Sequence, residues 1–393
     1  MYYHFDIQPV LVVLFEISVI ATLISLAIFL RRILPLHKQR RASNRRDGSL
    51  PDGARDGASI IVYSNDQSAE LESLLPQLLR QQYAPGYEVI VVNEGDSPRV
   101  RAVVEDLQMT HRNLYLTFTP DGARNLSRKK LALTLGIKAA RYPVAVMTAA
   151  GASVGSDGWL ARIMQHFSEN NHTEVVLGYA AFDPDDDSGA ARRVRSFDYV
   201  AESASWIADA VKGRPWRGTE YNLAYRRDLF FRNKGFSRHL NLRYGDDDIF
   251  ISEIATGANT VVELSDDSVV TILGGDSRRA ALDRSARRRF TERFIRRRPR
   301  LLDAIGRWAY LIALLTPVAA VAMDVSNGFV WTCAGVALLC WYLAGMVWCN
   351  VMTALRGRRL IASVPFILAL SPLRRIYRRL YAMARRSKRY TWE

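Results

Sequence analysis

The stretch SIIVYSNDQSAELESLLPQLLRQQY, from Ser59 to Tyr83, decides the fold of this chain together with EVIVVNEGDS, from Glu88 to Ser97. Ala58 to Ser64 is a short apolar run that predicts a buried strand, and Glu70 to Gln82 repeats leucine at the spacing of one helix face. Glu88 to Val92 predicts a second buried strand, which a polar turn closes. A strand, a helix and a strand in this order predict a parallel unit with a right-handed crossover.

The same pattern continues along the chain. Leu114 to Thr119 predicts a strand, Arg128 to Ala140 a helix, and Val144 to Thr148 another buried strand. We therefore expect an α/β fold with a doubly wound, mainly parallel sheet, whose ligand crevice lies outside the carboxyl ends of the strands. The segments that would meet at this crevice are Ser64 to Gln67, Asn93 to Asp96 and Thr148 to Ser153. None of them is a glycine-rich phosphate loop, which weakens a dinucleotide-binding or P-loop interpretation.

Three apolar runs outside this domain are candidate membrane spans. Val10 to Leu30 is long enough to cross a bilayer, which takes about twenty residues, and Trp308 to Met323 and Phe329 to Val351 are the other two candidates. Basic residues follow the first and third runs, so we expect the amino terminus outside and the soluble domain in the cytoplasm. For the second and third runs, a buried helical hairpin in a soluble domain is the alternative.

The expected organisation is a short external N-terminus over residues 1–9, spans over 10–30, 307–324 and 328–352, a flexible basic linker over 31–56, a soluble domain over 57–300 and a basic interfacial tail over 353–393.

The formal net charge of +15 comes from basic residues gathered beside the apolar runs. This distribution favours a membrane over nucleic acid as partner, because a nucleic-acid-binding protein would leave the apolar runs unexplained. Leu373 to Arg389 interleaves basic and apolar residues as an amphipathic helix on anionic lipid does, with a solvated tail as the alternative. All three cysteines lie in the third run and the six histidines show no metal-ligand spacing, which excludes a disulfide framework, a zinc cluster and a cysteine nucleophile in the soluble part.

Three consecutive carboxylates, Asp246 to Asp248, stand between Gly245 and an apolar run. Adjacent anions repel one another, and the apolar neighbours indicate that part of this charge faces an enclosed site. We interpret the triplet as a catalytic base region. The alternative is a structural role, in which the triplet caps a helix that begins at Ile249 or pairs with Arg226 and Arg227.

Four further stretches complete the pattern: SRKKLALTLGIKAA (Ser127 to Ala140), TAAGASVGSDGWL (Thr148 to Leu160), YNLAYRRDLFF (Tyr221 to Phe231) and GDDDIF (Gly245 to Phe250). Together with the two stretches quoted first, they occur in the order seen in family 2 glycosyltransferases of the GT-A fold, and the chain resembles the bacterial, membrane-anchored members of that family. The resemblance covers the soluble domain and extends to the arrangement of the spans. It implies a nucleotide-sugar donor and a multi-pass protein of the inner (plasma) membrane.

The resemblance also implies roles for single residues. The first two strand ends would hold the nucleotide base and ribose of the donor, and two lysines would reach the same crevice; these residues are Ser64, Asp66, Asn93, Glu94, Lys129 and Lys130. For each of these polar residues, turn chemistry or helix capping is the alternative. Aromatic faces and amides suit sugar rings and hydroxyls, so the candidate acceptor-binding residues are Trp216, Tyr221 and Asn222.

The chain departs from the family where a divalent metal is normally bound. The strand corresponding to Val144 to Thr148 is usually followed by two aspartates, and here Ala149 and Gly151 take their places. Neither side chain has an oxygen ligand for magnesium or manganese, so the use of a divalent metal stays open and no metal-binding residue is assigned. The acidic cluster Asp183 to Asp187 indicates a solvated loop, with a substitute metal site as its alternative.

A second departure is the absence of a tryptophan from the basic segment Arg284 to Phe290. In one interpretation arginines of this segment stabilise the departing diphosphate, since guanidinium groups match phosphate geometry. The arginines concerned are Arg284, Arg287, Arg288 and Arg289. In the other, these basic residues only orient the neighbouring span, and the domain has lost its chemistry.

The expected function is that of a membrane-anchored glycosyltransferase of the hexosyltransferase type. Asp247 would remove the proton of the acceptor hydroxyl in an inverting transfer, while Asp246 and Asp248 position the acceptor or cap a helix. The acceptor would be a lipid-linked or cell-envelope glycan. The alternative is a catalytically inactive relative that binds nucleotide or a partner enzyme at the membrane.

Overall fold

The computed structural model describes residues 6–46, 56–119, 126–183, 189–274, 277–295, 301–357 and 362–384. The chain divides into two compact units. A helical unit comprises Met1–His37, Asp187–Ser205 and Arg298–Tyr381, and an α/β unit comprises Lys38–Asp186, Trp206–Arg297 and Ala382–Glu393.

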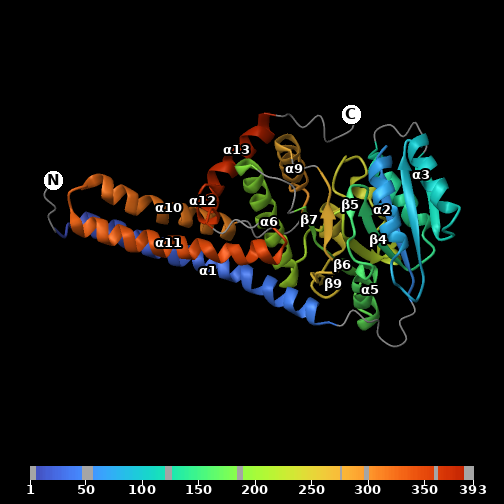
Figure 1. Cartoon of the computed structure of the whole chain (residues 1–393), viewed down its shortest axis with the longest axis horizontal. Helices are drawn as coiled ribbons and strands as arrows, with labels where there is room; N and C mark the ends of the chain where they lie inside the picture. Colours follow the sequence, from blue (N-terminus) through green and yellow to red (C-terminus); the bar gives the residue numbers. More distant parts are fainter. Residues whose placement is uncertain are drawn as a thin grey trace. The chain divides into compact units, whose positions relative to one another are not determined.

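The α/β unit is built on a seven-stranded sheet in the order β3-β2-β1-β4-β8-β6-β9 (Figure 1). The pairs β1–β2, β2–β3, β1–β4 and β6–β9 are parallel, whereas β8 runs antiparallel to both its neighbours. The strands are β1 (Ala58–Ser64), β2 (Tyr87–Glu94), β3 (Leu114–Thr119), β4 (Val144–Ala149), β6 (Val175–Leu177), β8 (Leu223–Arg226) and β9 (Thr260–Val262). The prediction of a doubly wound, mainly parallel sheet is confirmed. A smaller sheet has the order β5-β10-β7, from β5 (Ala152–Ser153), β10 (Val270–Ile272) and β7 (Ala180–Phe182).

Helix α4 covers the first three strands of the large sheet. At Gly136 a Cβ atom would lie 2.8 Å from the side chains of both Ile61 and Val92, so only glycine lets the helix approach the strands this closely. The helices of this unit are α2 (Ser68–Leu79), α3 (Pro98–Gln108), α4 (Arg128–Ala139), α5 (Trp159–Glu169), α7 (Arg227–Arg232), α8 (Ile249–Ile254) and α9 (Arg278–Thr291), with a 3₁₀ turn at Ser237–His239.

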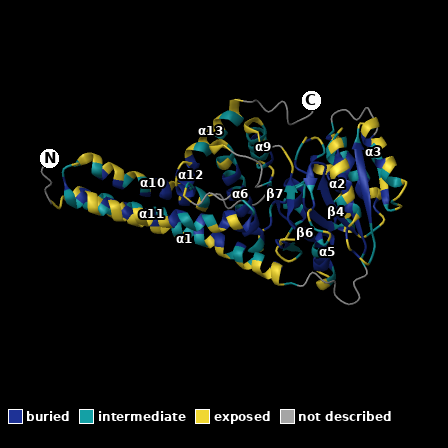
Figure 2. Cartoon of the chain, viewed as in Figure 1, coloured by how far each residue is buried: buried dark blue, intermediate teal, exposed yellow. Residues whose placement is uncertain are grey.

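The helical unit contains three helices that are long and apolar enough to cross a membrane. They are the first part of α1 (Pro9–Arg45), α10 (Leu301–Met323) and α11 (Gly328–Ala354). The unit also holds α12 (Val364–Ala369), the first part of α6 (Ala190–Val211) and α13 (Ser371–Ala384) up to Tyr381. Ser18 Oγ on α1 donates to the Ala313 carbonyl of α10 at 2.9 Å. Figure 2 shows exposed residues along the outer faces of these helices, and many of them are large and apolar. Such surfaces favour a membrane environment.

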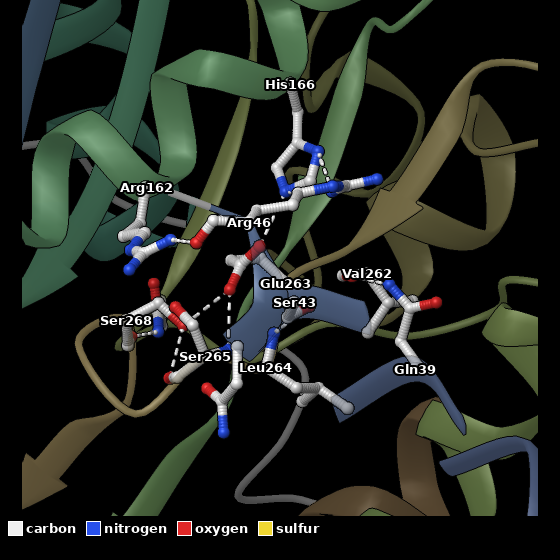
Figure 3. Close-up of polar contacts among 12 residues, drawn as sticks. Gln39, Ser43, Arg46, Arg162, His166, Val262, Glu263, Leu264, Ser265 and Ser268 are labelled. Atoms are coloured by element: carbon white, nitrogen blue, oxygen red, sulfur yellow. Dashed lines mark hydrogen bonds and ion pairs between the residues drawn. The ribbon is translucent and has the colours of Figure 1, made fainter. Parts of the chain in front are cut away.

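The end of α1 differs from the expected flexible linker. The helix continues to Arg45, and residues 47–55 of that expected linker lie outside the described residues. Within the α/β unit, Gln39 Nε2 donates to the Val262 carbonyl at 2.6 Å, and Arg46 Nη1 donates to His166 Nδ1 at 3.0 Å (Figure 3). These tertiary contacts stabilise a helical segment that the polar composition alone did not predict.

The contacts of Arg46 continue into a buried polar group around Glu263. His166 Nε2 lies 2.6 Å from Glu263 Oε2, and the other carboxylate oxygen accepts from the Ser265 amide at 2.6 Å and from Ser268 Oγ at 3.2 Å (Figure 3). Burial would raise the pKa of Glu263, but the hydrogen bond to His166 and those of the serines lower it. Because both carboxylate oxygens of Glu263 are hydrogen-bonded and His166 also contacts Arg46, this cluster holds the end of α1 beside the strand β9.

Candidate active site

The carboxyl ends of β1 and β2 bring the predicted donor residues together. Ser64 and Asn93 are paired in the register of the two strands. Ser97 Oγ donates to Asp66 Oδ1 at 2.5 Å, and Asn93 Nδ2 donates to the Ser97 carbonyl at 2.9 Å. Asn93 Oδ1 is buried and accepts no hydrogen bond within the described part of the chain. A buried acceptor without a donor indicates a place where a ligand group fits.

Glu94 connects this strand end to a narrow pocket. Tyr63 donates a hydrogen bond from its hydroxyl to Glu94, and burial together with this bond raises the pKa of Tyr63. The Lys129 ammonium lies 5.6 Å from the centre of the Tyr63 ring. The pocket is lined by Tyr63, Lys129, Leu133, Met147, Thr148, Ala149, Glu220, Leu223, Tyr225, Phe236, Asp246 and Asp247.

The acidic triplet reaches this pocket because of the turn at Gly245. This residue has φ of +112°, and a Cβ atom there would lie 2.5 Å from Ile249 Cδ1, so glycine is required on both counts. The alternative pairing of the triplet with Arg226 does not form, because Arg226 Nη1 instead contacts Asp56 Oδ2 at 3.1 Å. The three carboxylates then enter three different environments.

Asp248 has a structural environment. Its Oδ1 accepts from the Ile249 amide at 2.7 Å and caps α8, while its Oδ2 accepts a hydrogen bond from the Thr291 hydroxyl. Burial raises the pKa of Asp248 in spite of these bonds and of the positive charge of Arg217. The expectation that a triplet carboxylate caps the helix beginning at Ile249 is confirmed for Asp248.

Asp246 is buried in an ion pair. Lys129 Nζ lies 2.7 Å from Asp246 Oδ2 and also pairs with Glu220. Burial would raise the pKa of Asp246, but Lys129 lowers it below its ordinary value. Burial would likewise lower the pKa of Lys129, whereas Asp246 and Glu220 raise it well above its ordinary value. Lys129 is therefore a fixed positive charge in the pocket.

Asp247 is the carboxylate without a partner. Among the described residues its side chain has no hydrogen bond or ion pair, and it lines the pocket. Burial, followed by the negative charges of Asp248 and Asp246, raises the pKa of Asp247 to about 8, against the opposing effect of Arg217. A carboxylate with a pKa near the working pH is suited to general base catalysis.

Lys130 lies beneath the acidic loop and does not line the pocket. Its side chain is fully buried, and Nζ donates to the carbonyls of His239, Leu242 and Tyr244 at 2.7, 3.0 and 2.8 Å. His239 Nδ1 lies 2.8 Å from the same ammonium. Burial lowers the pKa of Lys130 to about 8. This position differs from the expected donor contact and ties the first turn of α4 to the loop that carries the triplet.

The residues at the end of β4 do not fit a divalent cation. Ala149 lines the pocket with a methyl group, and Gly151 forms a turn with φ of +81°. Among the residues that the structure describes, no three or more His, Cys, Asp or Glu side chains are grouped to hold a metal ion. Hard cations require several oxygen ligands, and the pocket carboxylates Glu220 and Asp246 are already paired with Lys129. Of the acidic cluster Asp183 to Asp187, only Asp183 is described.

The three expected acceptor residues are not brought to the Asp247 pocket. Asn222 is fully buried, donates to the Tyr179 and Ser268 carbonyls at 2.9 and 2.7 Å, and accepts from Trp159 Nε1 at 3.3 Å, which leaves its amide no free group. Tyr221 is half-buried and is not among the residues that line this pocket. Trp216 lines a separate pocket with Gly213, Arg214, Pro215, Ser252, Glu253, Ala255, Thr256 and Gly257.

Three residues of the site were missed by the sequence analysis: Tyr63, Arg217 and Glu220. The last two flank Gly218, whose amide donates to the Asp247 carbonyl at 2.8 Å. Arg217 and Glu220 stand directly before YNLAYRRDLFF in the sequence, so the segment before this stretch could have indicated them as site residues.

Helix α9 lies beside the acidic loop. Phe290 packs with Leu242 and Ile249, and the Arg287 guanidinium lies 4.5 Å from the centre of the Tyr244 ring. Arg287 is exposed and Arg288 is half-buried. The expected arginine segment is thus held next to the triplet.

The fold of the α/β unit is of the GT-A type. The solved structure of the mannosyltransferase PcManGT from Pyrobaculum calidifontis in complex with GDP-Man and Mn²⁺ is similar, with a TM-score of 0.56, 18% sequence identity and coverage of 92% of this chain and 99% of that chain. Weaker likenesses are TarS 1–349 of S. aureus (TM-score 0.40, 15% identity, 84% of this chain and 93% of that one) and mannosyl-3-phosphoglycerate synthase of Rubrobacter xylanophilus (0.38, 13%, 67% and 80%).

The chain belongs to glycosyl transferase family 21, whose sequence model matches residues 18–392. The expected enzyme class, a glycosyltransferase, is the same, whereas the expected family was family 2. A sequence search of curated proteins finds no significant match.

Proposed function

We propose that this protein is a membrane-anchored, inverting glycosyltransferase in which Asp247 is the catalytic base. The observation that carries the proposal is an unpaired carboxylate with a pKa of about 8 in a pocket whose other two carboxylates, Glu220 and Asp246, share Lys129 as ion-pair partner. Asp247 accepts the proton of the acceptor hydroxyl while the oxygen forms a bond to the anomeric carbon. The bond from that carbon to the phosphate oxygen breaks, and its electron pair leaves with the nucleoside diphosphate.

The donor is proposed to bind along the carboxyl ends of β1 and β2. Asn93 Oδ1 is available as an acceptor there, and Thr148 Oγ1 is a second buried polar atom without a partner among the described residues. Ser64, Asp66 and Glu94 complete this edge. The complex of PcManGT with GDP-Man supports a nucleotide sugar as the donor, without identifying the sugar or the base.

Positive side chains are proposed to stabilise the departing diphosphate. Lys129 is fixed in the pocket, and Arg287 and Arg288 lie on α9 beside the loop. Preorganised cations lower the barrier where negative charge develops. We assign Lys130 to holding the loop, because its ammonium is occupied by three carbonyls.

The acceptor is proposed to be a lipid-linked or cell-envelope glycan, reached from the cytoplasmic face of the inner membrane. The three apolar helices support anchoring, and the basic residues after α1 and α11 support this orientation. Trp216 and Tyr221 remain candidates for an outer part of the acceptor site, while Asn222 is assigned to the core.

The test is sugar transfer, and donor hydrolysis, by the purified full chain and by Asp247→Asn. Loss of a general base is expected to lower kcat by about 10²- to 10⁴-fold. Asp106→Asn, an exposed aspartate on α3, is the matched control and is expected to keep full activity. Equal rates for the Asp247→Asn and wild-type chains would disprove the assignment.

A catalytically inactive nucleotide-binding protein is the second candidate. It is favoured by Ala149 and Gly151, which offer no side-chain oxygen where related enzymes carry aspartates. This candidate predicts binding of a nucleoside diphosphate without any transfer or hydrolysis in wild-type protein.

A further inference from the structure

A cluster of arginines lies within the helical unit. Five guanidinium groups from three helices gather with three carboxylates, an excess of two positive charges. They are Arg32 on α1, Arg307 on α10 and Arg374, Arg375 and Arg378 on α13, with Asp198 and Glu202 on α6 and Asp303 on α10. We call this set the arginine cluster.

Three of these arginines are paired. Arg374 binds Asp198 through two bonds, from Nη2 to Oδ1 at 2.8 Å and from Nε to Oδ2 at 3.1 Å, and Arg378 contacts the same carboxylate. Arg32 pairs with Asp303, which also accepts a hydrogen bond from Ser205 Oγ at 2.9 Å. Asp198 and Asp303 are therefore used by these three arginines.

Arg307 and Arg375 are left without such partners. Arg307 is only 5% exposed, and among the described residues it has no hydrogen bond or ion pair. Its contact is with the ring of Trp348, whose centre lies 5.9 Å from the guanidinium carbon. Arg375 also has no hydrogen bond or ion pair to the described residues, and it is one of the charged groups acting most on Arg307. An unpaired buried guanidinium is costly, so a compensating anion is expected.

Two uncharged groups beside these arginines also lack partners. Trp348 Nε1 and Ser371 Oγ are buried and make no hydrogen bond within the described part of the chain. Trp348 carries the ring that Arg307 faces, and Ser371 precedes Arg375 by one helical turn, which places both on one face of α13. The cluster thus holds four polar side chains able to donate hydrogen bonds, and no acceptor among the described residues satisfies them.

We infer that the arginine cluster is a binding site for the phosphate group of an anionic ligand. A phosphate supplies several acceptor oxygens and up to two negative charges, which matches both the donors without partners and the excess of positive charge. Burial distinguishes this site from basic residues that only orient a span, because orientation requires no buried and unpaired guanidinium. The inference does not depend on the proposed transfer reaction.

The phosphate has two possible sources, a lipid headgroup or a free diphosphate. The outer face of α13 exposes apolar side chains at helical spacing, as a helix at a membrane surface does; they are Leu373, Ile376, Tyr377, Leu380 and Met383. A lipid phosphate would then reach the cluster from the same surface. A free diphosphate would instead reach it from water.

The test uses the full chain in nanodiscs and measures the midpoint of thermal unfolding. Discs of phosphatidylcholine alone are compared with discs containing phosphatidic acid and with phosphatidylcholine discs plus inorganic diphosphate. The wild-type midpoint is expected to rise with one of the two probes, which identifies the source. Arg307→Met and Arg375→Gln are expected to lose that rise and to weaken binding of the active probe by about tenfold or more.

The control is Arg379→Gln, which removes an exposed arginine from the same helix and is expected to keep the full response. In phosphatidylcholine discs without diphosphate, Arg307→Met is expected to unfold at or above the wild-type midpoint, since it removes an unpaired buried charge. A merely structural arginine would instead lower that midpoint. The inference is overturned if neither probe stabilises the wild-type chain, or if both cluster variants respond as the wild type does.

Discussion

The end of β4 and the loop before α8 face the same pocket with opposite chemistry. At the end of β4, Ala149 presents a methyl group and Gly151 a bare turn, whereas the loop presents three carboxylates in a row. One carboxylate caps a helix, one is neutralised by Lys129, and one is left unpaired. Neighbouring side chains therefore decide which of the three carboxylates keeps an unpaired charge. The fixed positive charge in this pocket is the ammonium group of Lys129.

The largest expected effect comes from removing that positive charge. Lys129→Met leaves the buried carboxylate of Asp246 without a cation, so the chain is expected to lose about 3–5 kcal/mol of unfolding free energy. Denaturant unfolding of the detergent-solubilised chain measures this loss. The double variant Lys129→Met with Asp246→Asn is expected to recover part of it, and no recovery would show that the two groups are not coupled.

The pH dependence of the transfer rate tests whether Asp247, the unpaired carboxylate of the triplet, is the catalytic base. Because its pKa is raised to about 8, the base is mostly protonated below that pH, and kcat/KM is expected to rise about tenfold per pH unit toward it. The free energy of unfolding is expected to change with pH in the opposite direction to kcat/KM. The folded chain holds this proton more tightly than the unfolded chain, so the stability contributed by the protonated group is lost as pH rises through about 8. A rate that is flat between pH 6 and 8 would contradict the assignment.

Placing a carboxylate at the end of β4 tests whether the lack of a side-chain oxygen at position 149 keeps a divalent cation from binding there. Ala149→Asp adds a buried negative charge beside Asp246 and Asp247, and it is expected to destabilise the chain by about 1–3 kcal/mol in the presence of a chelator. Added Mn²⁺ is expected to restore part of the unfolding midpoint in this variant and to leave the wild-type midpoint unchanged. An equal Mn²⁺ response in the two chains would mean that the wild-type chain already binds the ion.

The smallest expected effect is on the capping carboxylate. Asp248→Asn keeps an oxygen for the Ile249 amide, so stability is expected to change little, while one negative charge is removed from beside Asp247. The midpoint of the pH–rate profile is expected to move down by about one unit. An unmoved midpoint would show that Asp247 and Asp248 do not act on each other.

The sequence predicted several elements of the first half of the α/β unit well because their patterns repeat over several residues. The limits of β1 and β3 match the expected strands, and α4 differs from the expected helix by one residue at its end. The strands β5 to β10 were not predicted, because segments of two to four residues carry no readable periodicity. The helical extension of α1 to Arg45 depends on partners that are distant in sequence, so composition alone indicated a linker.

Lys129 and Lys130 are adjacent in sequence, but the sequence does not show that their side chains point in different directions. Both were expected to reach the donor, yet successive helix positions point about 100° apart, so one lysine enters the pocket and the other lies under the loop. Likewise, Asn222 was expected to contact the acceptor. In the structure its side-chain amide is hydrogen-bonded to the Tyr179 and Ser268 carbonyls and to the Trp159 indole.

By itself, the sequence determined the order of the first strands and helices, from β1 to β4, the three apolar runs and the absence of aspartates at positions 149 and 151, because each of these is a local property of the chain. Only the tertiary structure decided which of three identical carboxylates caps, which is neutralised and which stays free. The physical reason is that burial and charge act through space, and Lys129, Glu220, Thr291 and Arg217 reach the triplet from distant parts of the chain.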